Sequence, residues 1–294
     1  EEVLQHPLSD YEEEVALVYG GATKIKDYVF ESARLPEVRG ASSLLDRINL
    51  LDVPALWNCR PYRGQQWLEE GAFDRYQEVR NAFQGQSLDA PECLIYAGGG
   101  NFLALAPAKL APRLADAIEE IYTAETLVGK SVAVSRPFRL LELQYGYKPW
   151  EYWLDDYLRD LANPELCPIL EATYRTPEEN TSPPTAFLQK KTFGQLVTIL
   201  ASAVNRRRAG NGEKGRRDWP LPHYELPPHA MKCHSCDTRP AVVPVDLDEV
   251  TAGQTPKVFC LACARKRVTG QVATDWYDKR LSWQPTGVTS WGAK

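Results

Sequence analysis

Apolar residues in the first 136 positions are grouped in short runs that are bounded by glycine, proline or charged residues. The first run ends at Gly20-Gly21, which we interpret as a turn. Two later runs flank Gly98-Gly99-Gly100-Asn101 and predict a β-hairpin. Strands are therefore predicted at 15–19, 93–97, 102–106 and 131–134.

Between these runs, apolar residues recur with the helical spacing of three and four. Residues around Leu44 to Ile48 predict one amphipathic helix, with Ser42 or Ser43 as its N-cap, and a second is predicted over 112–124. The order is strand, helix, two-stranded hairpin, helix, strand, which is the split βαβ, ferredoxin-like (RRM-like) layout. We therefore predict an α+β fold in which two helices cover one face of an antiparallel four-stranded sheet.

Composition divides the chain into further segments. Residues 1–136 form the predicted ferredoxin-like palm, and residues 54–90 within it are weakly periodic, so we interpret them as an insertion. Residues 137–222 predict helices followed by a basic loop, residues 223–270 a zinc ribbon, and residues 271–294 a tail. Two apolar stripes are expected to be buried helix faces: Trp150, Trp153, Leu154, Tyr157, Leu158 and Leu161, and Phe193, Leu196, Val197, Leu200 and Val204.

Four cysteines are arranged in two close pairs, Cys233-x-x-Cys236 and Cys260-x-x-Cys263. Thiolates at this spacing can surround one tetrahedral ion, so the pattern predicts a Zn²⁺ site. The alternatives are two disulfides or four unrelated core cysteines. Four protein ligands leave no open coordination position, so we expect a structural ion. His234 lies inside the first pair and is a candidate to replace one cysteine ligand.

The hairpin turn is the place where a polymerase- or cyclase-type palm carries carboxylates that bind two divalent ions. Here neither the turn, Gly98-Gly99-Gly100-Asn101, nor the end of the first strand, Gly20-Gly21, contains an acid. Hard cations prefer several oxygen ligands, so we do not expect metal-dependent nucleotidyl transfer from this palm. The turn is a candidate nucleotide site that cradles phosphate through backbone N–H groups, and a tight turn without a ligand is the alternative.

Charge restricts where nucleic acid could bind. The formal net charge of the 294 residues is −5, so any contact with nucleic acid requires a local basic patch. The run Arg206-Arg207-Arg208, with Arg216 and Arg217, is the candidate for contacts with RNA phosphates. A solvated, flexible linker is the alternative interpretation of the same run.

Other features bear on the cellular setting. No apolar run approaches the roughly 18 residues of a membrane span, so we expect no membrane partner. Cys59, Cys93 and Cys167 are dispersed and expected to be free thiols, which together with a zinc site favours a reducing cytoplasm. The chain begins at Glu1, without a visible signal peptide, and we expect it to be part of a longer product. It contains no His-Asp dipeptide, Walker-type loop or Gly-x-Ser-x-Gly motif.

Three segments together resemble one known family. Asp-Tyr-Val-Phe-Glu-Ser at 27–32, followed by residues 34–46, looks like the opening of the first palm domain in the large subunit of type III CRISPR effector complexes. Residues 94–102 look like that domain's Gly-Gly-Asn hairpin. The paired cysteines, with Arg239-Pro240-Ala241, are similar to its inserted zinc ribbon. The resemblance extends in order over residues 15–270.

The resemblance implies a subunit at the foot of a ribonucleoprotein that carries a guide RNA. In that family, target RNA switches on a His-Asp nuclease that cuts single-stranded DNA and a second, acidic palm that makes cyclic oligoadenylates from ATP. The first palm lacks the carboxylates and helps to hold ATP, with which Gly98 to Asn101 agree. The implied partners are other effector subunits, guide RNA, target RNA and single-stranded DNA, with ATP and Mg²⁺ bound in the full assembly.

This chain departs from the family pattern, because it has no His-Asp domain before residue 15 and no acidic palm after the zinc ribbon. We therefore predict an inactive palm and zinc ribbon that scaffold an antiviral ribonucleoprotein. One alternative is an active nucleotidyltransferase that works together with a second acidic palm. Another is a free zinc-ribbon protein that binds nucleic acid, which the acidic net charge disfavours.

Overall fold

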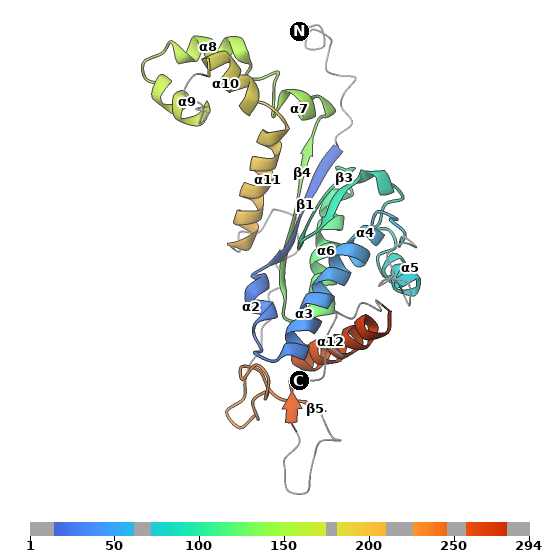
Figure 1. The fold of residues 1–294 in the computed structure, drawn as a ribbon. Helices are drawn as coiled ribbons and strands as arrows, with labels where there is room; N and C mark the ends of the chain where they lie inside the picture. The colour runs from blue at the N-terminus through green and yellow to red at the C-terminus, as the bar shows by residue number, and fades with distance from the viewer. Residues whose placement is uncertain (1–14, 62–71, 175–180, 210–225, 246–256, 281–294) are drawn as a thin grey trace, which may run out of the picture.

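A four-stranded antiparallel sheet lies at the centre of the computed structural model, which describes residues 15–61, 72–174, 181–209, 226–245 and 257–280 (Figure 1). The strand order is β2-β3-β1-β4, and β1 pairs in antiparallel fashion with both β3 and β4. The predicted α+β class and antiparallel four-stranded sheet are confirmed. The strands are β1 (Val15–Thr23), β2 (Leu94–Gly98), β3 (Asn101–Pro107) and β4 (Lys130–Phe138).

Both faces of the sheet are covered by helices (Figure 1). On one face, Ala16 and Val18 of β1 belong to the same buried cluster as residues of α3 (Leu35–Arg47) and α6 (Ala111–Thr126). On the other face, Leu17 packs in a cluster with residues of α11 (Phe193–Arg208). Because successive side chains of a strand point to opposite faces, burial on both sides explains the continuous apolar run in β1.

The first strand does not end at Gly20-Gly21, and the turn predicted there is wrong. β1 continues to Thr23, with Gly20 opposite Ala133 of β4 and Gly21 opposite Asn101 of β3. A Cβ atom on Gly21 would lie 1.9 Å from the carbonyl oxygen of Gly100. The glycines therefore allow close backbone approach inside a strand, which a sequence pattern does not distinguish from a turn.

The first predicted helix begins earlier than expected. α3 starts at Leu35, with a proline in its first turn, so Ser42 and Ser43 lie inside the helix and not at its cap. It continues through a π-helical turn, Ile48–Asp52, into the short α4 (Val53–Ala55).

The main core extends beyond these helices. Trp57 is fully buried and donates a hydrogen bond of 2.8 Å from its indole N–H to the Leu105 carbonyl. The core thus reaches into the segment that we interpreted as an insertion, before α5 (Ala72–Ala82) and a 3₁₀ turn (Pro91–Cys93).

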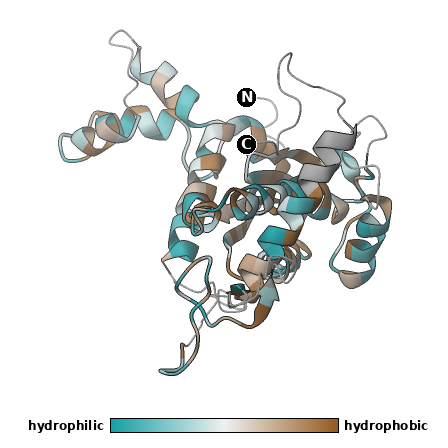
Figure 2. Cartoon of the chain, turned by 60° about the horizontal axis from the view of Figure 1, so that its bottom comes forward, coloured by the Kyte–Doolittle hydropathy of each residue, from teal (hydrophilic) through white to brown (hydrophobic). Residues whose placement is uncertain are grey.

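The helices that directly precede α11 in the sequence form a smaller lobe that projects away from the sheet in Figure 1. Tyr157 and Phe187 stack at its centre with ring centroids 4.7 Å apart. Of the first predicted stripe, Tyr157 is buried and Leu158 is 39% exposed, so that stripe is only partly a buried face. Figure 2 shows hydrophilic and hydrophobic residues mixed along these helices. The helices of the lobe are α8 (Leu154–Leu161), α9 (Cys167–Tyr174) and α10 (Pro183–Lys190), while α7 (Leu140–Tyr145) lies at the end of β4.

Only part of the second stripe forms the sheet-facing side of α11. Leu196 and Leu200 are buried there, whereas Phe193 and Val197 are exposed. A short α2 (Ile25–Val29) connects β1 to α3.

The C-terminal part consists of a two-stranded hairpin and a long helix. β5 (Val243–Val245) pairs with β6 (Lys257–Phe259), and α12 (Leu261–Arg280) packs against α3. α12 runs across residue 270, where the sequence interpretation placed the start of a tail. None of the described helices is long and apolar enough to cross a membrane.

Candidate metal centre and adjoining groove

Four cysteine side chains converge beside the C-terminal hairpin. Cys233, Cys236, Cys260 and Cys263 are buried, and their Sγ atoms all lie within 4.8 Å of one another. The Sγ atoms of Cys236 and Cys260 are 3.9 Å apart, close to the roughly 3.8 Å edge of a tetrahedron with Zn–S bonds of about 2.3 Å. All four are free thiols and not disulfides. The donor set and spacing therefore fit one structural ion such as Zn²⁺.

The first cysteine pair is held by a tight loop. The Cys233 N–H donates to the Arg239 carbonyl at 2.8 Å, and the Asp237 N–H donates to the Cys233 carbonyl at 2.9 Å. Asp237 adopts a left-handed conformation with φ +58°, which aspartate tolerates better than most residues. The Ser235 N–H donates to the Cys233 sulfur at 3.4 Å. The loop thus directs the Ser235 N–H toward the Cys233 sulfur.

The second pair uses the start of a helix. Cys260 immediately precedes α12, and its sulfur accepts a 3.5 Å hydrogen bond from the Cys263 N–H in the first turn. A sulfur at this position occupies the place of a capping oxygen. The positive end of the helix dipole also favours the ionised thiolate, which is the form that binds metal.

Protonation of three of the thiols, Cys236, Cys260 and Cys263, is coupled through their close contacts. Hydrogen bonds from Cys260 and Cys263 lower the pKa of the Cys236 thiol. The contact with the Cys236 sulfur raises the pKa of both Cys260 and Cys263. Because the form of cysteine that binds metal is the thiolate, binding of a divalent cation at this cluster is coupled to loss of the thiol protons. With four protein ligands, such an ion has no open position for substrate or water.

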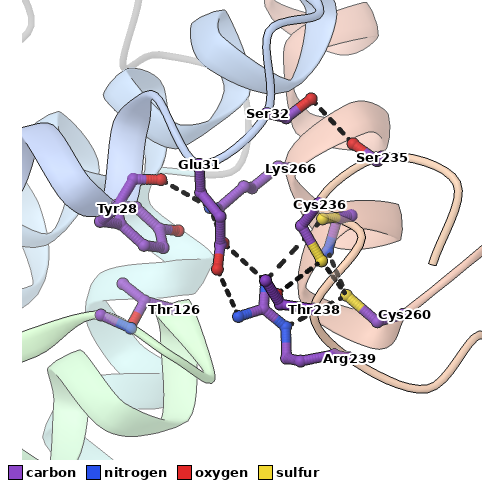
Figure 3. Close-up of polar contacts among 12 residues, drawn as sticks. Tyr28, Glu31, Ser32, Thr126, Ser235, Cys236, Thr238, Arg239, Cys260 and Lys266 are labelled. Atoms are coloured by element: carbon purple, nitrogen blue, oxygen red, sulfur yellow. Dashed lines mark hydrogen bonds and ion pairs between the residues drawn. The ribbon is translucent and has the colours of Figure 1, made fainter. Parts of the chain in front are cut away.

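A network of buried charges connects the cysteines to the sheet domain (Figure 3). The Arg239 Nε donates to the Cys260 sulfur at 3.3 Å, and its terminal N–H groups form an ion pair with Glu31. Lys266 donates to Glu31 at 3.0 Å and to the Tyr28 carbonyl at 2.7 Å. Glu31 and Lys266 were not identified from the sequence, because a partner more than 200 positions away leaves no local pattern.

Two glycines fix the metal-binding segment against the sheet domain. Gly40 of α3 and Gly270 of α12 lie where the two helices cross. A Cβ on Gly40 would be 1.7 Å from the Lys266 carbonyl oxygen, and one on Gly270 would be 1.9 Å from that of Pro36. The two backbones therefore approach more closely than any residue with a Cβ permits.

His234 is not positioned as a metal ligand. It is exposed, and its Nδ1 accepts a 2.8 Å hydrogen bond from the Val258 N–H. Its backbone N–H donates in turn to the Val258 carbonyl at 3.1 Å. The side chain thus joins the first cysteine loop to β6, and the cluster of possible ligands consists of the four cysteines.

The glycine turn closes the β2–β3 hairpin with two residues. Gly99 and Gly100 have φ of +61° and +89°, and Gly98 pairs with Asn101. Two central residues with positive φ are typical of a type I′ turn, which requires glycine or asparagine. The Gly100 carbonyl accepts a 2.9 Å hydrogen bond from the Ala22 N–H, so the turn is held against β1.

A groove of about 500 Å³ lies beside this turn. Of the four predicted nucleotide-binding residues, Asn101 lines the groove, while Gly98, Gly99 and Gly100 form the turn next to it. The charged residues along the groove are Lys24, Lys26, Asp27 and Arg208. Three cations and one carboxylate give the groove a positive balance, which favours an anionic ligand.

The predicted basic patch is split by the fold. Arg206 and Arg208 are exposed at the end of α11, but Arg207 is 1% exposed and forms a 2.7 Å ion pair with Glu119. Its burial makes Arg207 a structural residue in this fold and not a surface contact for RNA; Glu119 also accepts the N–H of Ala133 in β4, so the ion pair is tied to the sheet. Arg216 and Arg217 lie outside the described residues.

No family model matches the chain, and no curated protein matches it.

Proposed function

We propose that this chain is the inactive-palm and zinc-ribbon part of the large subunit of a type III CRISPR effector complex, where it scaffolds the ribonucleoprotein. The observation that carries the proposal is the groove beside the glycine turn. At the edge where a catalytic palm gathers carboxylates, this groove gathers Lys24, Lys26 and Arg208.

The fold supports the proposal at the level of architecture. A sheet of order β2-β3-β1-β4 with α3 and α6 on one face has the strand order and helix placement of a ferredoxin-like (RRM-like) palm. The four-cysteine cluster lies in the segment that resembles the inserted zinc ribbon. Both features occur in the order that the resemblance implies, from residue 15 to residue 270.

The charges in the groove favour holding ATP over carrying out chemistry on it. Among the described residues, Asp27 is the one carboxylate that lines the groove, and a pair of divalent ions requires several oxygen ligands. Cationic side chains instead suit the phosphates of a nucleotide. Exposed Arg206 and Arg208 at the same edge offer contacts for the phosphates of guide or target RNA.

Affinity purification of the tagged chain from its native cells tests the scaffold function. We expect guide RNA and neighbouring effector subunits to co-purify at near-physiological ionic strength. A chain recovered without RNA and without partner subunits would contradict the proposal.

An enzymatic alternative is favoured by one observation, the presence of Asp27 in a groove large enough for a nucleotide. A second, acidic palm would have to supply the remaining carboxylates. Incubation of the chain and of its purified complex with ATP and Mg²⁺ or Mn²⁺ distinguishes the two. We expect no oligoadenylate from the chain alone; a product that disappears in Asp27→Asn would establish the enzymatic alternative.

A further inference from the structure

A second, smaller pocket lies between the sheet domain and the metal centre. Its volume is about 220 Å³, which is below the roughly 300–1,000 Å³ typical of sites for whole small molecules. A pocket of this size suits a single ionic group. It is lined by Thr23, Lys24, Asp27, Tyr28, Glu31, Val128, Lys130 and Arg239.

Strand pairing brings two lysines to this pocket. Lys130 begins β4 and pairs with Thr23 at the end of β1, directly before Lys24. Neither lysine makes an ion pair with another residue in the part of the chain that the structure describes. Two ammonium groups held at one edge without a counter-charge are suited to an external anion.

The acids of the pocket do not cancel this positive charge. Glu31 is already engaged by Arg239 and by Lys266, as Figure 3 shows. Asp27 is exposed and is the other carboxylate lining the pocket. The charged residues that line the pocket are therefore three cations, Lys24, Lys130 and Arg239, and two carboxylates, which leaves a balance of one positive charge.

Tyr28 contributes an unsatisfied hydroxyl. The residue is 6% exposed, and its hydroxyl has no hydrogen-bond partner among the described residues. Burial, followed by the charge of Glu31, raises the pKa of Tyr28, so the group is a proton donor at neutral pH. A buried donor without an acceptor is unfavourable, and an anionic oxygen at this pocket would satisfy it.

We propose that this pocket binds a phosphate monoester, held by Lys24, Lys130 and Arg239 with a hydrogen bond from the Tyr28 hydroxyl. The phosphate belongs either to a free nucleotide or to the 5′ end of an oligoribonucleotide, because both present the same group. The pocket adjoins the groove beside the glycine turn and shares Thr23, Lys24 and Asp27 with it; Lys130 lines the pocket but not the groove, and Lys26 lines the groove but not the pocket. The proposal does not depend on the CRISPR assignment.

Binding measurements on the full chain, purified without chelator, test the pocket. The probes are inorganic phosphate, ATP, and one oligoribonucleotide carrying either a 5′-phosphate or a 5′-hydroxyl. We expect one of the two phosphate sources to bind. If it is the oligoribonucleotide, the 5′-phosphate should improve its affinity about tenfold, which is the effect of one charge-assisted hydrogen bond. If it is the free nucleotide, ATP should bind and inorganic phosphate should compete with it. Lys130→Gln should abolish the effect, and the charge-matched Lys109→Gln, whose exposed side chain lines neither the pocket nor the groove, should retain it.

Tyr28→Phe separates binding from folding. Because the hydroxyl is unsatisfied without ligand, we expect the variant and the original chain to unfold at the same temperature when no phosphate is present. Phosphate should raise the unfolding temperature of the variant by less than it raises that of the original chain. No preference for any phosphate-bearing probe would overturn the proposal. A preference lost equally in Lys109→Gln and Lys130→Gln would also overturn it, since the loss would then come from the net charge and not from the pocket.

Discussion

At the scale of single residues, Arg206, Arg207 and Arg208 are adjacent in sequence but have different surroundings. Arg207 is buried against Glu119, 88 positions away, while its neighbours are exposed. A run of arginines is normally a solvated face, so its pattern gave no sign of a buried partner. The metal-binding cysteines could be predicted because the two ligands of each pair lie within four residues of each other. This spacing is typical of a tetrahedral metal site and can be recognised in the sequence.

The metal site makes a direct prediction for one cysteine. Cys263→Ser removes one of four thiolates, so we expect the metal content to fall from about one ion per chain to well below half of that. Elemental analysis of the purified protein measures this content. Cys167→Ser is the matched control, since Cys167 lies on α9 and outside the cluster, and it should keep the metal. Equal metal content in both variants would contradict a four-cysteine site.

Glu31 is predicted to be important for stability because it faces two buried cations. Glu31→Gln leaves Arg239 and Lys266 without their carboxylate, and the Lys266 side chain is 1% exposed. Removing one partner of a buried pair costs about 3–5 kcal/mol, and the 20% exposure of Glu31 reduces this to about 1–3 kcal/mol of unfolding free energy.

Urea unfolding measures the effect of Glu31→Gln, and an exposed ion pair supplies its control. Glu78 pairs with Arg75 at 3.2 Å and its side chain is 66% exposed, so Glu78→Gln should change the unfolding free energy by less than about 0.5 kcal/mol. If the two variants unfold at the same urea concentration, the buried network contributes no more to the free energy of unfolding than a surface ion pair does.

At the scale of elements, the existence of the strands and helices could be predicted from the sequence, whereas the residues at which they end and the elements that they contact could not. The hairpin of β2 and β3 followed from two apolar runs around a glycine turn. Gly20-Gly21 misled the interpretation because the need for glycine there comes from β3 and β4, which lie more than 70 residues further along the chain. The crossing of α3 and α12 at two glycines left no sequence signal for the same reason.

Because α3 and α12 cross closely, an alanine substitution at the crossing should lower the stability of the protein, although alanine normally stabilises a helix. Alanine normally stabilises a helix by about 1 kcal/mol relative to glycine. In Gly270→Ala, however, the added methyl group meets the Pro36 carbonyl, so α12 must move away from α3. We expect a net loss of about 1–3 kcal/mol in the free energy of unfolding, measured with denaturant.

Gly194 of α11 provides the control for this substitution. The nearest atom to a Cβ there is 3.7 Å away, and the residue is exposed, so Gly194→Ala should be neutral or slightly stabilising. A stabilising effect of alanine at both positions would show that the helices do not cross as closely as the structure indicates.

At the scale of the whole molecule, an acidic protein can bind RNA only where exposed cations gather on its surface. The net charge of −5 opposes association, while Arg206 and Arg208 are exposed together at one edge. If both contact RNA phosphates, Arg206→Gln/Arg208→Gln should weaken binding and lower the slope of log affinity against log salt by about 1.4, or 0.7 for each phosphate of a single strand. Fluorescence anisotropy at several salt concentrations measures this slope.

The charge-matched control for the RNA prediction is Lys109→Gln/Arg113→Gln, which removes two exposed cations near the start of α6. Because this variant makes the net charge equally more negative, any general electrostatic effect appears in both proteins. A local contact changes the slope only in the α11 variant. Equal slopes would show that RNA is attracted to the molecule without contacting this edge, and the assignment of Arg206 and Arg208 would then be wrong.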